Sequence, residues 1–219
     1  MADRRNRGRA PRLGAALAAL LLAAAPAAGA AERGYAKRVP SLLELRREGV
    51  AIQQWDLSCG AATLATLLEG QFGEPVTERQ LAASMLGRTD AALVRKRLGF
   101  SLLDMKRELA RRGYRGEGYG GLSLADLLGL APAIVPLQGP GYSHFVVVRG
   151  AAGGRVVVAD PAYGNRTMDP ERFAAAWRER IAFVARRPDG AAPPGRLAVD
   201  PSRVPLVPPQ AVRVALSRP

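Results

Sequence analysis

The feature that most constrains the fold is a pair of valine-rich runs separated by glycines. Residues 145–148 and 156–159 are apolar and largely β-branched, and residues 150–154 between them include three glycines. β-Branched side chains suit a pleated sheet, and glycine suits the turns that join its strands. The sequence therefore predicts an antiparallel hairpin with a glycine-rich loop in the C-terminal half of the chain.

Helical patterns precede this hairpin, and short strands and a helix surround it. Thr77 and Gln80 form a capping box that predicts a helix through residue 85. Comparable patterns predict helices at 61–69, 101–112, 124–128 and 170–177, and strands at 132–137 and 181–184. The pattern favours an α+β fold with an N-terminal helical half, a C-terminal antiparallel β half and a site between them.

Two further segments carry weaker patterns. Residues 116–121 are rich in glycine, so we interpret them as a loop. The segment at 31–47 is a charged lead-in, and we expect its leucines to pack against the domain; these are Leu42, Leu43 and Leu45.

Only one cysteine and one histidine are present in 219 residues. Cys59 directly precedes the helical run at 61–69, and His144 opens the first valine-rich run. A helix N-terminus carries partial positive charge, which together with a nearby imidazole lowers the pKa of a thiol. Cys59 is therefore a candidate nucleophile with His144 as its base, although an inert buried thiol is the other interpretation of Cys59 alone. We expect no metal or cofactor, because one cysteine and one histidine do not make an ordinary zinc site.

Asp160 ends the second valine-rich run and is the candidate partner of His144. If Arg149 pairs with Arg155 at the end of the hairpin, the same register places His144 opposite Asp160 on one side of the sheet. This register is an assumption, and a slip of one residue would separate the two side chains. The alternative is that Asp160 only begins a strand-ending turn.

Acyl transfer through a thioester also needs a hydrogen-bond donor for the developing oxyanion. Gln53 and Gln54 lie six and five residues before Cys59. A side-chain amide from either glutamine could act there beside the backbone N–H of Cys59, and a surface position is the other interpretation of each.

The first 30 residues resemble an export signal. Five arginines precede an uncharged apolar run at 13–25, and Ala28-Gly29-Ala30 follows as a cleavage site with small residues. We expect cleavage near Ala30 and an exported protein, periplasmic or secreted; an uncleaved membrane anchor is the alternative. The predicted organisation is a signal peptide at 1–30, the lead-in at 31–47, one domain at 48–187, and a mostly disordered Pro/Arg-rich tail at 188–219.

The formal charge of +13 comes mainly from arginines spread along the chain. An arginine- and alanine-biased proteome explains it better than nucleic-acid binding does, because no stretch interleaves basic residues with stacking aromatics. We therefore expect no nucleic-acid partner, and contact with a membrane only through the signal segment.

Taken together, the candidate residues resemble a known family. Gln53, the run Cys59-Gly60-Ala61-Ala62, His144 and Asp160 are similar to the motifs of bacteriocin-processing peptidases that remove double-glycine leaders. The similarity covers about residues 48–187. The resemblance implies a papain-like cysteine peptidase fold, with Cys59 as nucleophile, His144 as general base, Asp160 as orienting group and Gln53 in the oxyanion hole.

Many members of that family are domains of peptide-exporting ABC transporters, but this sequence contains no GxxxxGK[ST] phosphate loop. It is more similar to free-standing exported members, including those encoded with functional-amyloid secretion systems. The resemblance implies a leader-bearing or secreted peptide or protein as substrate, and a separate secretion apparatus as partner.

Two other functions use the same features. An acyltransferase or amidase would need the same cysteine, histidine and aspartate. A module that binds a leader peptide without cutting it would belong to the degenerate members of the family, which are expected to lack the cysteine that this chain retains.

Overall fold

The computed structural model describes residues 39–139, 142–190 and 195–200. The expected signal peptide at 1–30 and the last part of the tail, 201–219, lie outside the described residues. The described residues, from Val39 onward, belong to one compact unit, which contains every helix and strand given below.

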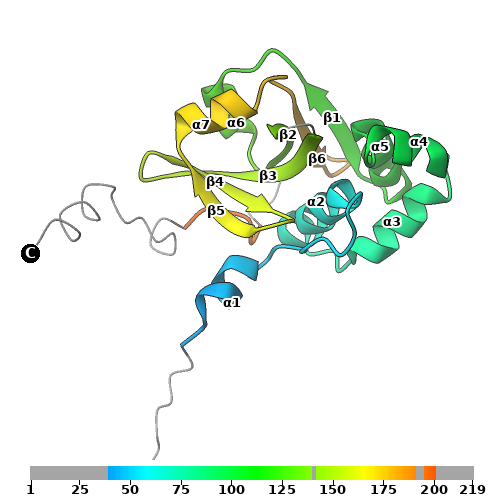
Figure 1. Ribbon diagram of the computed structural model, residues 1–219, viewed down its shortest axis with the longest axis horizontal. Coiled ribbons are helices and arrows are strands. Elements are labelled where there is room, and N and C mark those ends of the chain that lie inside the picture. Colours follow the sequence, from blue (N-terminus) through cyan, green and yellow to red (C-terminus); the bar gives the residue numbers. More distant parts are fainter. Residues whose placement is uncertain (1–38, 140–141, 191–194, 201–219) are drawn as a thin grey trace, which may run out of the picture. The chain divides into compact units, whose positions relative to one another are not determined.

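The centre of the fold is an antiparallel sheet of six strands in the order β1-β6-β2-β3-β4-β5 (Figure 1). The strands are β1 (Arg115–Tyr119), β2 (Ala133–Gly139), β3 (Tyr142–Ala152), β4 (Arg155–Asp160), β5 (Gly164–Met168) and β6 (Ala182–Arg186).

Seven α-helices lie in the described part of the chain: α1 (Leu42–Arg47), α2 (Cys59–Leu67), α3 (Glu78–Leu86), α4 (Ala91–Arg97), α5 (Leu102–Arg111), α6 (Leu124–Leu130) and α7 (Pro170–Ala176). A short π-helix, η1 (Leu68–Phe72), extends α2. The capping box of Thr77 and Gln80 starts α3 as expected, and Asp169 caps α7 with Pro170 at its first position.

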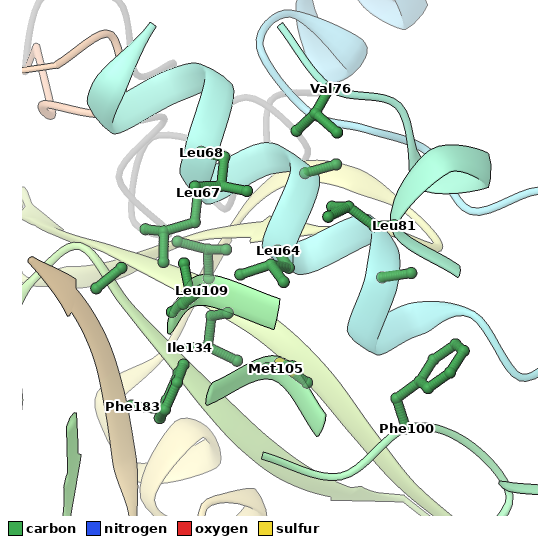
Figure 2. Packing of buried hydrophobic residues seen from close by; sticks show 14 of the residues in the cluster. Leu64, Leu67, Leu68, Val76, Leu81, Phe100, Met105, Leu109, Ile134 and Phe183 are labelled. Atoms are coloured by element: carbon green, nitrogen blue, oxygen red, sulfur yellow. The ribbon is translucent and has the colours of Figure 1, made fainter. Parts of the chain in front are cut away.

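Two apolar clusters cover the two faces of the sheet. Leu64 and Leu67 of α2 pack with α3 and α5 on one face, and Figure 2 shows them beside Ile134 and Phe183 of the sheet. On the other face, Phe173 of α7 and the nearby Trp177 pack in the second cluster. Consecutive valines on β3 belong to alternate clusters, with Val147 in the first and both Val146 and Val148 in the second. Burial on both faces explains why the valine-rich runs lack polar alternation.

The predicted α+β architecture is confirmed, but several elements differ from the sequence-based expectation, among them the helix α1 in the lead-in segment. Residues 116–121, interpreted as a loop, largely form β1, and neither β5 nor α4 was predicted. Gly116 is a packing requirement of β1, because a Cβ atom there would lie 2.6 Å from the Phe183 ring. Propensity arguments do not predict such a strand, because Gly116 is required by a neighbouring side chain and not by the strand itself.

The flanking segments also differ from expectation. The leucines of α1 do not pack into the domain, and Leu42 and Leu43 are 78% and 55% exposed. Residues 195–200, which belong to the tail expected to be disordered, pack onto the domain instead. Leu197 is buried in the same cluster as the leucines of α2. Arg149 donates hydrogen bonds to three carbonyl oxygens of this segment, those of Arg196, Leu197 and Ala198.

The hairpin register is not the one assumed. Gly153 and Gly154 both have positive φ, so they form a two-residue turn and Ala152 pairs with Arg155. A β-bulge then shifts the ladder between Val148 and Gly150, after which Val147 pairs with Ala159. Without the bulge, the same turn would place Val147 opposite Asp160 and would turn His144 to the other side of the sheet. The bulge therefore returns His144 to the side of the sheet on which Asp160 lies.

Candidate active site

Cys59 is the first residue of α2 and is buried, with 6% of its surface exposed. Ser58 occupies the N-cap position, but its side chain makes no capping bond; it donates to the Trp55 carbonyl oxygen at 2.6 Å and contacts Glu78. The first N–H groups of α2 are therefore not satisfied by a side-chain cap, which leaves the positive end of the helix beside the thiol.

A cleft of about 280 Å³ opens beside Cys59. The candidate residues Gln53, Cys59 and His144 all line it. The remaining lining residues are Asp56, Leu57, Leu98, Tyr142, Ser143, Ala162 and Tyr163. The cleft therefore combines residues from the segment before α2, the first residue of α2, the α4–α5 connection, β3 and the β4–β5 turn.

His144 and Asp160 form a direct pair. The Nε2 atom of His144 lies 2.8 Å from Oδ1 of Asp160, and the continuing ladder puts His144 two residues beyond the position opposite Asp160. An offset of two keeps both side chains on one side, because strand side chains alternate with period two. With Nε2 bound to the carboxylate, the other ring nitrogen, Nδ1, is left for the thiol.

The electrostatics favour a charged thiolate–imidazolium pair. Burial would raise the pKa of the Cys59 thiol, but hydrogen bonding to His144 and to the Phe145 backbone lowers it below its ordinary value. Burial would lower the pKa of His144, but Asp160 and Cys59 raise it to about 9. The pKa of the thiol is thus lowered and the pKa of the imidazole is raised. Both changes favour a nucleophilic thiolate beside a protonated base.

Asp160 is fully buried, and its carboxylate accepts several hydrogen bonds. Oδ1 accepts from His144 and from the backbone N–H of Ala162 at 2.9 Å. Oδ2 accepts from Arg166 Nε at 2.9 Å and lies 2.7 Å from its Nη2. Burial would raise the pKa of Asp160, but these partners, His144 foremost, lower it.

The two glutamines lie in different surroundings. The backbone N–H of Gln53 donates to the Pro161 carbonyl oxygen at 2.9 Å, so Gln53 is tied to the residue that follows Asp160. Its Nε2 donates to the Trp55 carbonyl oxygen at 3.3 Å, which leaves the second N–H of the amide for another acceptor. Gln54 is exposed, its Nε2 donates to Ile52, and it does not line the cleft.

The structure brings all four sequence-predicted residues together, and it adds one that sequence reasoning missed. Arg166 lies on β5, a strand of mixed polar residues that has no apolar alternation to mark it. Only the strand register points to Arg166. Asp160 pairs with Gly164 of β5, and Arg166 lies two residues farther along β5, so its side chain is on the same side of the sheet as that of Asp160.

Within residues 39–139, 142–190 and 195–200, no group of three or more His, Cys, Asp or Glu side chains is arranged to hold a metal ion. Across those same ranges, no helix has both the length and the apolar character needed to cross a bilayer.

Comparison with known proteins identifies the family. The model of the peptidase C39 family matches residues 47–189. The chain belongs to this family. The match covers the expected domain and confirms the resemblance to the double-glycine leader peptidases.

Two curated relatives carry the name "Probable functional amyloid protease FapD". The protein from Pseudomonas aeruginosa is 41% identical over 149 residues, and the one from Pseudomonas fluorescens is 39% identical over 148. Each alignment covers 68% of this chain and 65% of the relative, so the chain spans slightly less than two thirds of the length of these relatives.

Among solved structures, the peptidase domain of Streptococcus ComA, a bifunctional ABC transporter involved in quorum sensing, is similar. Its TM-score is 0.52 at 21% identity, and the match covers 63% of this chain and 97% of that domain. The likeness confirms the papain-like peptidase fold.

Proposed function

We propose that this chain is an exported cysteine peptidase that hydrolyses peptide bonds through a thioester intermediate. Cys59 is the nucleophile, His144 the general base and acid, Asp160 the group that orients the imidazole, and Gln53 an oxyanion donor. The observation that carries the proposal is the cleft, where the only thiol lies beside the only imidazole and the imidazole is bound by a buried carboxylate.

The reaction follows from these contacts. The thiolate of Cys59 attacks the peptide carbonyl carbon, and the oxyanion accepts from the Cys59 backbone N–H and the free N–H of Gln53. The imidazolium of His144 then donates its proton to the leaving amine as the C–N bond breaks and the thioester remains. Water attacks the thioester while His144 accepts a proton, and the thiolate leaves from the second tetrahedral intermediate.

The walls of the cleft support a substrate with small residues at the scissile bond. Leu98, Tyr142 and Tyr163 line the cleft and are large, exposed side chains, so bulky substrate side chains would meet them there. We therefore propose cleavage after glycine-rich, leader-type sites, in a secreted peptide or protein. The relatives named as functional amyloid proteases make a component of an amyloid secretion system the first substrate to test.

The decisive experiment incubates the mature protein with the proteins encoded beside it and maps new termini by mass spectrometry. Cys59→Ala should abolish cleavage, because no other thiol exists in the chain, while its circular dichroism and unfolding midpoint stay those of a folded domain. Retained cleavage by the purified variant would disprove the assignment. New termini carrying an added amine acceptor, instead of water, would indicate an acyltransferase.

The two adjacent glutamines form a matched pair for the oxyanion assignment. Gln53→Ala should lower kcat about 100-fold or more, because one oxyanion donor is lost. Gln54→Ala removes the same amide one residue away and outside the cleft, so its kcat should stay within about twofold of the parent. Equal losses in both variants would show that the segment, and not the Gln53 amide, is required.

Export is part of the proposal through residues 1–30. Expression of the full chain with detection of the mature N-terminus by sequencing tests cleavage near Ala30. A chain that keeps its first 30 residues and fractionates with the membrane would support the anchor instead.

A further inference from the structure

Asp160 has two cationic partners of different kinds. His144 exchanges its proton in every catalytic cycle, whereas Arg166 is permanently charged. The guanidinium of Arg166 holds Oδ2, through Nε at 2.9 Å and Nη2 at 2.7 Å, and leaves Oδ1 to the imidazole. Neighbouring strands β3, β4 and β5 thus contribute an imidazole, a carboxylate and a guanidinium in one row.

The burial of Asp160 explains why a permanent cation matters. Its carboxylate is 0% exposed, and a buried charge is costly unless it is paired. When His144 is neutral, its Nε2–H can still donate to the carboxylate, but Arg166 is then the charged partner that remains beside Asp160, together with the Ala162 N–H. A site without Arg166 would hold the proton on the His144–Asp160 pair more tightly, and the imidazolium would be a weaker acid toward the leaving amine.

We propose that Arg166 is a positioning residue of the catalytic row, which keeps Asp160 ionised while His144 releases its proton. This proposal rests on the function proposed above and deepens it. Arg166 does not line the cleft, so it acts through Asp160. It also lies over the ring of Tyr163, 5.5 Å from the centroid, and so connects the carboxylate to a wall of the cleft.

The direction in which the pKa of His144 changes when Arg166 is removed separates this role from a merely structural one. Removing a positive charge next to the pair raises the pKa of His144. If Arg166 only held Asp160 in position, its loss would weaken the Asp160 contact that raises the pKa of His144, and that pKa would fall. Cys59 from α2 and Tyr142 from β3 lie beside His144, and Asp56 and Tyr163 are further titratable side chains that line the same cleft.

His144 is the only histidine, so its imidazole gives a single set of side-chain NMR signals in a protein freed of any histidine tag. Its titration is measured in the Cys59→Ala background, which removes the coupled thiol and needs no catalysis. There Arg166→Gln and Arg166→Met should each raise the midpoint by about half a pH unit or more. Arg166→Lys keeps the charge, so its titration midpoint should stay close to that of the parent.

Arg155→Gln is the matched control, because Arg155 contacts Thr167 and no residue of the row. It removes one charge and should leave the midpoint unchanged. A fall or an unchanged midpoint in the Gln and Met variants would overturn the proposal, and so would failure of both to fold, which would assign Arg166 to stability alone. These outcomes do not depend on activity, so they are distinct from failure of the peptidase assignment, which the cleavage experiment reports.

Discussion

The two segments that flank the domain behave in opposite ways. The leucine-rich α1 buries none of its residues, whereas the glycine- and arginine-containing segment at 195–200 inserts Leu197 into the central cluster. Both segments approach the domain closely at a glycine, α1 at Gly164 and the C-terminal segment at Gly70, but only the C-terminal segment turns an apolar side chain inward. Gly70 and Gly195 allow the close approach, since a Cβ atom on either would lie within about 2.5 Å of the opposing segment. Apolar composition alone therefore does not determine which segment joins a core.

Leu197→Ala should produce the largest loss of stability. It removes a fully buried side chain from the α2 cluster, and such changes cost about 2–5 kcal/mol in the free energy of unfolding. Urea unfolding of the parent and the variant measures this cost directly. A change below about 0.5 kcal/mol would mean that the segment at 195–200 does not contribute to the core in solution.

Arg149→Met should have an intermediate effect. The guanidinium donates to the Leu197 carbonyl oxygen at 3.0 Å and to Asn165 Oδ1 at 2.7 Å, and both acceptors would lose this donor. We expect a loss of about 1–3 kcal/mol in the free energy of unfolding. In combination with Leu197→Ala the losses should be less than additive, because both changes release the same segment; strict additivity would contradict this coupling.

Leu43→Ser in α1 should have the smallest effect. The side chain is 55% exposed, so its replacement should change the free energy of unfolding by less than about 0.5 kcal/mol. The same urea titration measures it beside the Leu197 variant. A cost comparable to that of Leu197→Ala would remove the contrast between the two flanking segments.

The sequence could predict those parts of the fold in which a residue's own chemistry determines its place. The box of Thr77 and Gln80, Pro170 at a helix start and the two valine-rich runs all lead to the observed elements. β1 and β5 could not be predicted in this way, because their residues suit neighbouring surfaces and show no periodic apolar pattern. The exposure of α1 likewise depends on the surfaces available to it.

The site was more predictable than the surrounding register. Cys59 and His144 are the only cysteine and the only histidine in the sequence, and Asp160 directly follows the second valine-rich run. The assumed pairing of Arg149 with Arg155 was wrong, yet it placed His144 and Asp160 on the same side, because the true ladder differs from it by two residues at that point. Arg166 could not be found, since its contact with Asp160 depends on a strand that the sequence does not reveal.

The bulge in β3 has a practical consequence for protein engineering. Arg149 is the extra residue between the pairs Val148–Val158 and Gly150–Val157, so deleting it would leave a regular ladder with the same partners on both sides. The hairpin could therefore shorten by one residue with His144 still on the side of the sheet where Asp160 lies, and it would lose the Arg149 side chain that holds the C-terminal segment.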